Sequence, residues 1–293
     1  MTEIKVFGRP KKKIIALLEQ SLKKLDLDTP KIYLAFARNE NEIVRYREKF
    51  GRISITDFKS EEKRRYFESL IKKEFPYVRA MYVTRARRKE SFPPVIFVNL
   101  GSKAPEINWE ESILHETLHL KSEAMGWMEI TDKANARAEE GFCLQIGDIQ
   151  ILAAINNCID DFFGDEVACQ YGFANYVLRR KRSHIHVVVK SGEKLSEEER
   201  IELFEGPWID VFEGVIHFAF TINLPPSYPG REGEQKLLEK ELSPVLRYIP
   251  EYIDFQKLAL LPSQIKMPPE ERNLLKIYGK IFVMYNDFLN HFV

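Results

Sequence analysis

Residues 108–126 read NWEESILHETLHLKSEAMG, and several local features predict that they form one helix. Asn108 suits the N-cap position, and Glu111 stands three residues later, as in a capping box. Gly126 follows the last predicted helical residues, where glycine commonly ends a helix. The histidine face of this helix is available for chemistry, because apolar residues fall on the opposite side. These residues are Ile113, Leu120 and Ala124.

The pattern H-E-x-x-H lies inside this stretch, at His115, Glu116 and His119. Residues four apart on a helix are separated by a rise of about 6 Å along one face, so both imidazoles could bind a single cation. Glu116 points partly toward the same face, where it could deprotonate a water bound to the metal. The competing interpretation is an ordinary amphipathic helix whose two histidines face solvent.

The motif resembles that of the zincin metallopeptidases, and the resemblance is gluzincin-like over residues 95–172. Uncharged residues around the histidines are typical of that group, although Lys121 stands where an apolar residue is usual. The resemblance implies a Zn²⁺ cofactor and a hydrolase, above all a metallopeptidase that acts on peptides or proteins. It also implies that His115 and His119 bind zinc and that Glu116 is the general base.

A catalytic zinc ion needs a third protein ligand, and three acidic residues after the motif compete for this role. Asp161 is preferred, because it lies on a stripe of small or polar residues that would let its helix approach the histidine helix closely. Its spacing from Asp165 resembles a gluzincin pair in which one carboxylate binds zinc and the other accepts a ring N–H from a ligating histidine. Asp165 and Glu140 stay open as alternative ligands, since the sequences D-x-x-A and E-G-F that they begin are similar to gluzincin turns. The stripe consists of Ala154, Asn157, Asp161, Asp165, Ala168 and Gly172.

The predicted fold class is α+β, with a zincin-like core made of an edge strand, the H-E-x-x-H helix and a long ligand-bearing helix. Residues 95–100 form a six-residue apolar run with strong strand character. The zincin resemblance implies an edge strand here, whereas the residues alone equally suit a buried central strand. We expect a mixed N-terminal region at 1–92, the zincin-like core at 93–180 and a mostly helical region at 181–293. No linker separates these regions convincingly.

Histidines outside the motif carry weaker signals. Residues 183–190 alternate between polar and apolar, which predicts a half-exposed strand with His184 and His186 on one face. His184, His186 and Tyr171 are candidates for stabilising an oxyanion during hydrolysis. His217 stands among apolar residues and is predicted to be a satisfied core histidine.

The composition of the 293 residues indicates a soluble cytoplasmic protein. Lys+Arg and Asp+Glu both number 44, so no net charge attracts nucleic acid or an anionic membrane. The 3 cysteines have no paired spacing and suggest reduced thiols. We expect neither a signal peptide nor a membrane-spanning helix, because no apolar run reaches the roughly 18 residues required. The charged fraction of 30% is thermophile-like.

A second hypothesis concerns the basic residues within 79–89, which are Arg79, Arg85, Arg87, Arg88 and Lys89. Such a patch could bind nucleic acid, in a non-catalytic protein whose metal is structural or absent. No nucleic-acid motif accompanies the charge, so we prefer to interpret the patch as a solvated strand or loop and expect no nucleic-acid partner.

Overall fold

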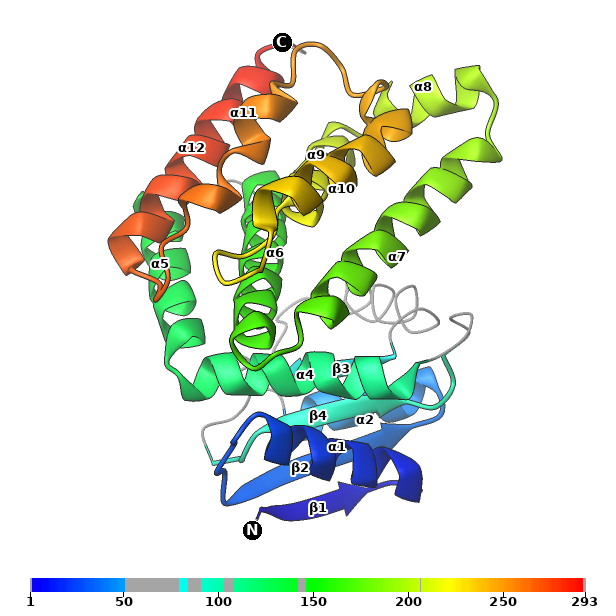
Figure 1. The fold of residues 1–293 in the computed structure, drawn as a ribbon, viewed down its shortest axis with the longest axis vertical. Coiled ribbons are helices and arrows are strands. Elements are labelled where there is room, and N and C mark those ends of the chain that lie inside the picture. Colours follow the sequence, from blue (N-terminus) through cyan, green and yellow to red (C-terminus); the bar gives the residue numbers. More distant parts are fainter. Residues whose placement is uncertain are drawn as a thin grey trace. The chain divides into compact units, whose positions relative to one another are not determined.

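The computed structural model describes residues 2–50, 79–83, 91–102, 108–141, 146–205 and 207–291. The chain divides into two compact units, an N-terminal unit at Met1–Glu129 and a C-terminal unit at Ile130–Val293. The boundary between them falls inside the region expected at 93–180. Each unit is described by itself below, and the element labels are those of Figure 1.

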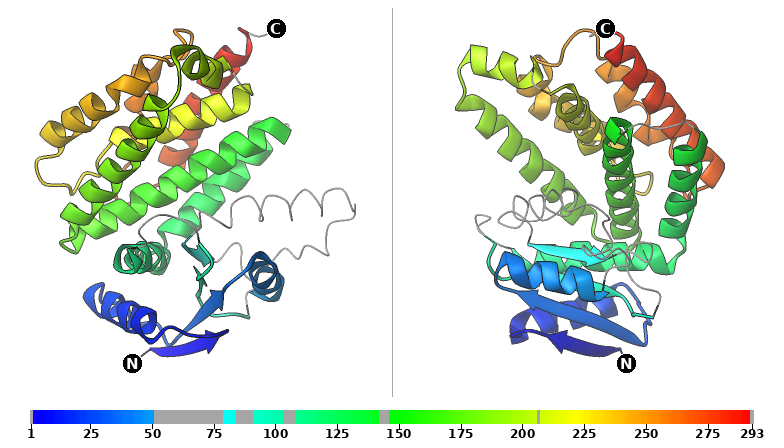
Figure 2. Two further views of the ribbon diagram at one scale, coloured as in Figure 1. Left: turned by 90° about the vertical axis from the view of Figure 1, so that its right-hand side faces the viewer. Right: turned by 180° about the vertical axis from the view of Figure 1, so that it is seen from behind.

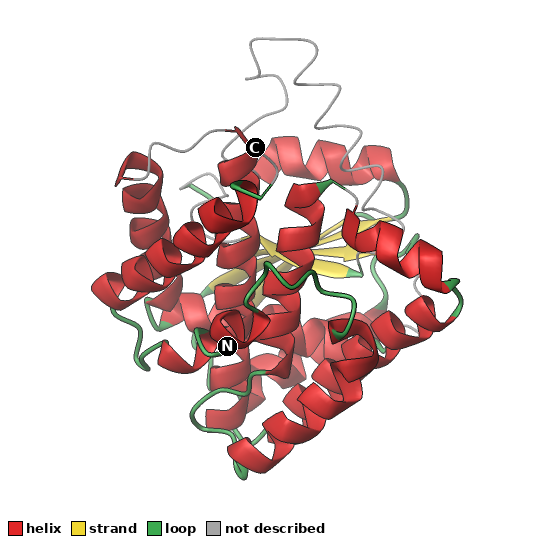
Figure 3. Cartoon of the chain, turned by 90° about the horizontal axis from the view of Figure 1, so that it is seen from above, coloured by secondary structure: helices red, strands yellow, loops and turns green. Residues whose placement is uncertain are grey.

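The described strands all lie in the N-terminal unit and form one mixed four-stranded sheet (Figure 3). The strands run in the order β1-β2-β4-β3. β1 pairs with β2 and β2 with β4 in parallel, whereas β3 pairs with β4 in antiparallel orientation. The predicted α+β fold class is confirmed, whereas the zincin-like core stays a prediction. The strands are β1 (Glu3–Phe7), β2 (Lys31–Ala37), β3 (Ala80–Val83) and β4 (Val95–Asn99).

The strand predicted at the edge of the sheet is a central strand. β4 lies between β2 and β3, and all five of its residues are buried. A strand that is apolar on both faces is stable only where neighbouring elements cover both faces, so the apolar run belongs inside the sheet. The edge position is taken instead by β3, and the edge-strand prediction for residues 95–100 is wrong.

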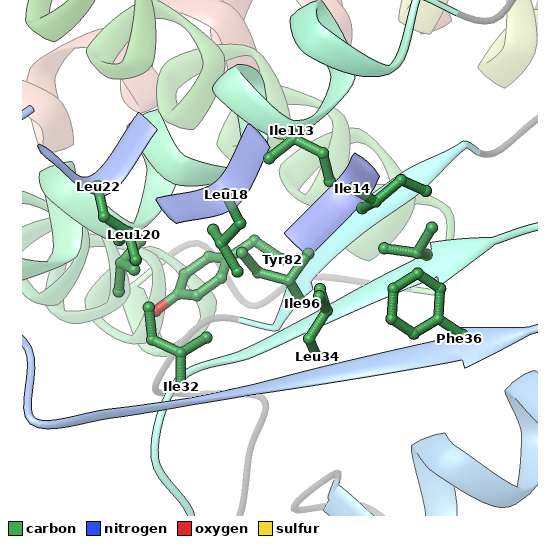
Figure 4. Packing of buried hydrophobic residues seen from close by; sticks show 11 residues of the cluster. Ile14, Leu18, Leu22, Ile32, Leu34, Phe36, Tyr82, Ile96, Ile113 and Leu120 are labelled. Carbon is green, nitrogen blue, oxygen red and sulfur yellow. The ribbon is translucent and has the colours of Figure 1, made fainter. Parts of the chain in front are cut away.

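Helices cover both faces of this sheet (Figure 2). The N-terminal unit contains α1 (Lys12–Lys24), α2 (Glu40–Phe50) and α4 (Trp109–Ala124). α1 and α4 share one core with one face of the strands (Figure 4), and α2 packs against the other face through Ile43 and Phe50. Since successive strand residues point to opposite faces, each strand contributes alternate residues to the two cores. The core under α1 and α4 consists of Ile14, Leu18, Leu22, Ile32, Leu34, Phe36, Tyr82, Ile96, Val98, Ile113 and Leu120.

The signals that predicted the motif helix are confirmed in α4. Asn108 is its N-cap, with Oδ1 accepting the Glu111 N–H at 3.3 Å. The helix ends before Gly126, which has a φ of +78° that residues with a side chain rarely adopt. Ile113 and Leu120 lie in the core, as the amphipathic pattern required, whereas Ala124 in the last turn is exposed.

Replacing Asn108 by alanine should lower the free energy of unfolding of the protein by about 1 kcal/mol, because the first turn of α4 loses its side-chain acceptor. Urea denaturation followed by circular dichroism measures this change. Asn108→Asp is the matched control and should retain the stability, since aspartate caps equally well. An equal loss in both variants would contradict the capping role.

In the described part of the C-terminal unit all regular secondary structure is helical. In this unit α6 packs against α7 and α9, and α7 against α10. No described helix is both long enough and apolar enough to cross a membrane. The helices are α5 (Trp127–Gly141), which begins before the unit boundary, α6 (Ile146–Gln170), α7 (Ala174–Glu193), α8 (Glu197–Glu205), α9 (Trp208–Ile222), α10 (Arg231–Leu246), α11 (Phe255–Ala259), η3 (Pro262–Gln264) and α12 (Glu271–Leu289).

The strand predicted at residues 183–190 is wrong, because this segment belongs to α7. The buried residues Val177, Lys181 and Ile185 recur every four positions, which is the spacing of one helix face. The strand prediction depended on the short alternation around Ile185, which does not extend to the buried Lys181. A lysine on a buried face is unusual unless it is paired, and Lys181 is paired.

Candidate functional site

His115 and His119 face each other on α4. Their Nε2 atoms lie 3.1 Å apart, and their rings meet edge to face with centroids 4.6 Å apart. Two nitrogens bound to one tetrahedral zinc ion, at Zn–N distances of about 2.05 Å, would be roughly 3.3 Å apart. The pair therefore has a spacing that suits chelation of a single cation. The same distance also suits a hydrogen bond from one ring to the other.

The core and a hydrogen bond from Lys121 hold the orientation of α4, and the Thr117 hydroxyl is satisfied within the helix. Thr117, on the buried side, donates its hydroxyl to the Ile113 carbonyl oxygen at 2.6 Å. Lys121 Nζ donates to the Asp26 carbonyl oxygen at 3.0 Å, beyond the end of α1. This bond gives Lys121 a structural role at the position where zincins usually have an apolar residue.

Glu116 is anchored to the edge of β3 that faces away from β4. Its side chain is buried, with 7% of the residue exposed, and Oε2 accepts the Tyr82 N–H at 2.6 Å. In an antiparallel pair the residues alternate between bonding the partner strand and facing away from it. Asn99 N–H bonds the Arg79 carbonyl oxygen, so the Tyr82 N–H faces away from β4 and is available to Glu116. This charge-assisted bond fixes the carboxylate in the N-terminal unit.

The two aspartates expected near a metal lie on α6 in the C-terminal unit, where they share Arg180. Arg180 Nη1 donates to Asp161 Oδ2 at 3.0 Å, and Nη2 donates to both oxygens of Asp165 at 2.8 and 2.9 Å. Lys181 Nζ lies 3.1 Å from Asp165 Oδ2 and donates to the Phe220 carbonyl oxygen at 3.1 Å. Asp165 is 2% exposed, whereas the Asp161 side chain is 43% exposed. Asp165 thus holds two cations, and Asp161 is the more accessible carboxylate.

Burial acts on both cations of this cluster. Burial lowers the pKa of Arg180, but the charges of Asp165 and Asp161 outweigh this effect and raise the pKa well above its ordinary value. Burial lowers the pKa of Lys181, and the attraction of Asp165 compensates only in part. Arg180 therefore stays charged, and Lys181 depends on Asp165 for its charge.

The remaining predicted residues are dispersed. Glu140 is exposed on α5, and its neighbour Phe142 lies outside the described residues. His184 and His186 lie on α7, and Tyr171 follows the end of α6. In the basic patch, Arg79 precedes β3, while residues 84–90 lie outside the described residues. The third-ligand and nucleic-acid hypotheses stay predictions.

Comparisons with protein-family models, with curated proteins and with solved structures find no match for this chain. The zincin resemblance therefore stands on the residues quoted for it, and function has to be argued from the chemistry of the site.

Sequence reasoning missed two contacts that matter for chemistry. The donor to Glu116 is a backbone N–H of β3, and every non-proline residue has such a group. The order of side chains in the sequence therefore could not predict this bond. The pairing of Cys158 with His217 joins residues 59 positions apart on α6 and α9. The sequence offered one signal for this pair. His217 lies in an apolar segment, where a buried thiol such as Cys158 could be its partner.

Proposed function

We propose that this protein is a zinc-dependent hydrolase, and more specifically a metallopeptidase. The observation that carries the proposal is the 3.1 Å separation of the His115 and His119 Nε2 atoms, on the helix that also holds Glu116. Two imidazole nitrogens and a carboxylate form a donor set typical of catalytic zinc. His115 and His119 would hold the metal ion.

Asp161 is the third ligand in this proposal. Its helix carries the stripe of small and polar residues described above, and its carboxylate is about half exposed. Asp165 suits the role less well, because both of its oxygens already accept hydrogen bonds from Arg180. Its contribution would be to hold Arg180 in place beside Asp161.

A bound zinc ion supplies a Lewis acid that makes water acidic near neutral pH and polarises a carbonyl group. Glu116 would take the proton of the attacking water and pass it to the leaving nitrogen of the amide. Because Oε2 is held by the Tyr82 N–H, Oε1 would be the oxygen that accepts this proton. The edge of β3 would thereby keep the general base in one position throughout the reaction.

Metal content tests the proposal directly. Protein purified with zinc in the medium should contain about one zinc ion per chain by elemental mass spectrometry. His115→Ala plus His119→Ala should reduce the content to near zero, because one carboxylate alone binds zinc weakly. His186→Ala plus His291→Ala is the matched control, since both residues are exposed and lie outside α4.

Zinc-free wild-type protein, or zinc retained equally in both double variants, would show that the two rings form only a hydrogen bond with each other. Either result would remove the basis of the proposed hydrolase.

A further inference from the structure

Cys158 on α6 is paired with a histidine on α9, entirely within the C-terminal unit. Its Sγ lies 3.3 Å from His217 Nδ1, and the other ring nitrogen, Nε2, lies 3.8 Å from Glu213 Oε1. Gln150 Nε2 donates to Glu213 Oε2 at 3.1 Å and steadies that carboxylate. α6 and α9 pack directly against each other (Figure 1). A thiol, an imidazole and a carboxylate are therefore neighbours in that order, which is the order of nucleophile, base and orienting group.

The paired thiol lines a cavity of about 140 Å³ that is partly open to solvent. A cavity of about 150 Å³ accommodates a molecule of the size of benzene, so this one can take a small organic group but not a folded chain. Its wall combines apolar residues with charged groups. The lining residues are Cys158, Asp161, Phe162, Asp165, Arg180, Lys181, His184, His217, Phe220 and Thr221.

Arg180, one of the lining residues, is held by its neighbours and has a buried donor on the side away from the cavity. Arg180 Nε is buried, and within the described ranges of the chain no group accepts its hydrogen. The terminal nitrogens of the same guanidinium are already engaged by Asp161 and Asp165. The two carboxylates thus fix the guanidinium in the cavity wall.

We propose that Cys158, His217 and Glu213 form a second, thiol-based active site that accepts the acyl group of small uncharged esters or thioesters. This site lies within the C-terminal unit and needs neither His115 nor His119, although Asp161, the third zinc ligand proposed above, also lines its cavity.

The transfer proceeds in two steps. The proton shared by Cys158 and His217 resides on His217 at the start, and the sulfur attacks the carbonyl carbon, forming a C–S bond while an electron pair moves onto the carbonyl oxygen. When the pair returns, the bond to the leaving alcohol or thiol breaks, and His217 gives its proton to the departing group. The acyl group stays on Cys158 as a thioester, and neither oxidant nor reductant is required.

The electrostatics support this assignment. Burial lowers the pKa of His217, but the interactions with Cys158 and Glu213 outweigh this effect and raise the pKa to about 10. A protonated imidazole beside the sulfur stabilises the thiolate, which is the reactive form. Cys169 on the same helix is the natural comparison, because burial and the charges of Asp165 and Glu166 raise the pKa of its thiol to about 12.

The probe is p-nitrophenyl acetate, added to the folded full-length protein, with peptide mass spectrometry to locate the acetyl group. We expect acetylation at Cys158 before Cys169, with release of about one equivalent of p-nitrophenol in a burst. Cys158→Ser should abolish the burst, and His217→Asn should slow it by roughly 10²-fold or more. His115→Ala plus His119→Ala should leave acetylation intact, because zinc hydrolysis produces turnover without a covalent adduct.

Alkylation by iodoacetamide needs no variant and tests the thiol alone. Cys158 should react at least about ten times faster than Cys169 in the folded protein. Equal rates at the two cysteines would overturn the proposal, and so would an unchanged burst in a folded His217→Asn or Cys158→Ser variant. Alkylation of Cys158 without acetylation would overturn the acyl-transfer assignment.

Discussion

Replacing Glu116 by glutamine should reduce peptide hydrolysis by about 10²- to 10⁴-fold and leave the zinc content unchanged. Glutamine has nearly the same shape as glutamate, and its carbonyl oxygen can still accept the Tyr82 N–H that now holds Oε2 at 2.6 Å. The substitution therefore preserves the helix and the anchor on β3 but removes the group that takes a proton. Loss of activity with retained zinc would show that Glu116 acts as the general base and not as a metal ligand.

Labelled casein and a library of fluorogenic peptides, assayed with the zinc-loaded protein, provide the measurement. Glu110→Gln is the matched control, because Glu110 is exposed in the first turn of the same helix and should tolerate the change. A Glu116→Gln variant as active as the wild type would exclude the proposed mechanism. A wild-type protein that holds zinc and cleaves none of these substrates would exclude the peptidase assignment.

Replacing Asp165 by asparagine should lower the free energy of unfolding by about 3 kcal/mol, near the lower end of the range for breaking a buried ion pair. Asp165 is 2% exposed and Lys181 5% exposed, and Arg180 donates to both oxygens of this carboxylate. Removing the negative charge leaves the two cations facing one another with little solvent to screen them. Lys181 can relieve part of the cost by losing its proton, since burial already lowers its pKa.

Thermal and urea unfolding of the metal-free protein measure this effect. Asp161→Asn is the control, because this partner of Arg180 is about half exposed and its loss should cost less than about 1 kcal/mol. Adding Lys181→Met to the Asp165 variant should restore part of the stability, since a buried charge is removed together with its partner. Equal costs at Asp161 and Asp165 would contradict the central role of Asp165.

Zinc binding by the same two aspartate variants shows which carboxylate binds the metal and which one only supports the site. Asp161→Asn should weaken zinc binding by at least about 10-fold if Asp161 is the third ligand, while a folded Asp165→Asn variant should bind zinc with little change. The reverse order of effects would assign the ligand role to Asp165 instead. Glu140→Gln should change neither stability nor zinc content, since Glu140 is exposed.

Elements whose signals are local could be predicted from the sequence. The motif helix was recognisable from its N-cap Asn108, its stop at Gly126 and the apolar spacing of Ile113 and Leu120, all of which act within a few turns. These features could be found because helix hydrogen bonds and caps join residues close in the chain.

Signals that depend on distant partners were misread. The run at residues 95–100 was expected at an edge, because apolar character shows that a strand is covered but not which strands lie beside it. The helix α7 was not predicted, because a lysine at position 181 does not suggest a buried helix face. Lys181 can be buried there only because Asp165 pairs with its charge. The same reason applies to Cys158, whose partner His217 lies on another helix.

By itself, the sequence determined the α+β class and a helix with two histidines on one face, since short-range periodicity and capping decide these properties. Only the tertiary structure decided which strand forms the edge, that Glu116 is bound to that edge through Tyr82, and which carboxylates hold Arg180 and Lys181. Those outcomes depend on burial and on charge pairing between residues far apart in the chain. Such pairs are chosen by the packing of whole elements, which no local stretch of residues encodes.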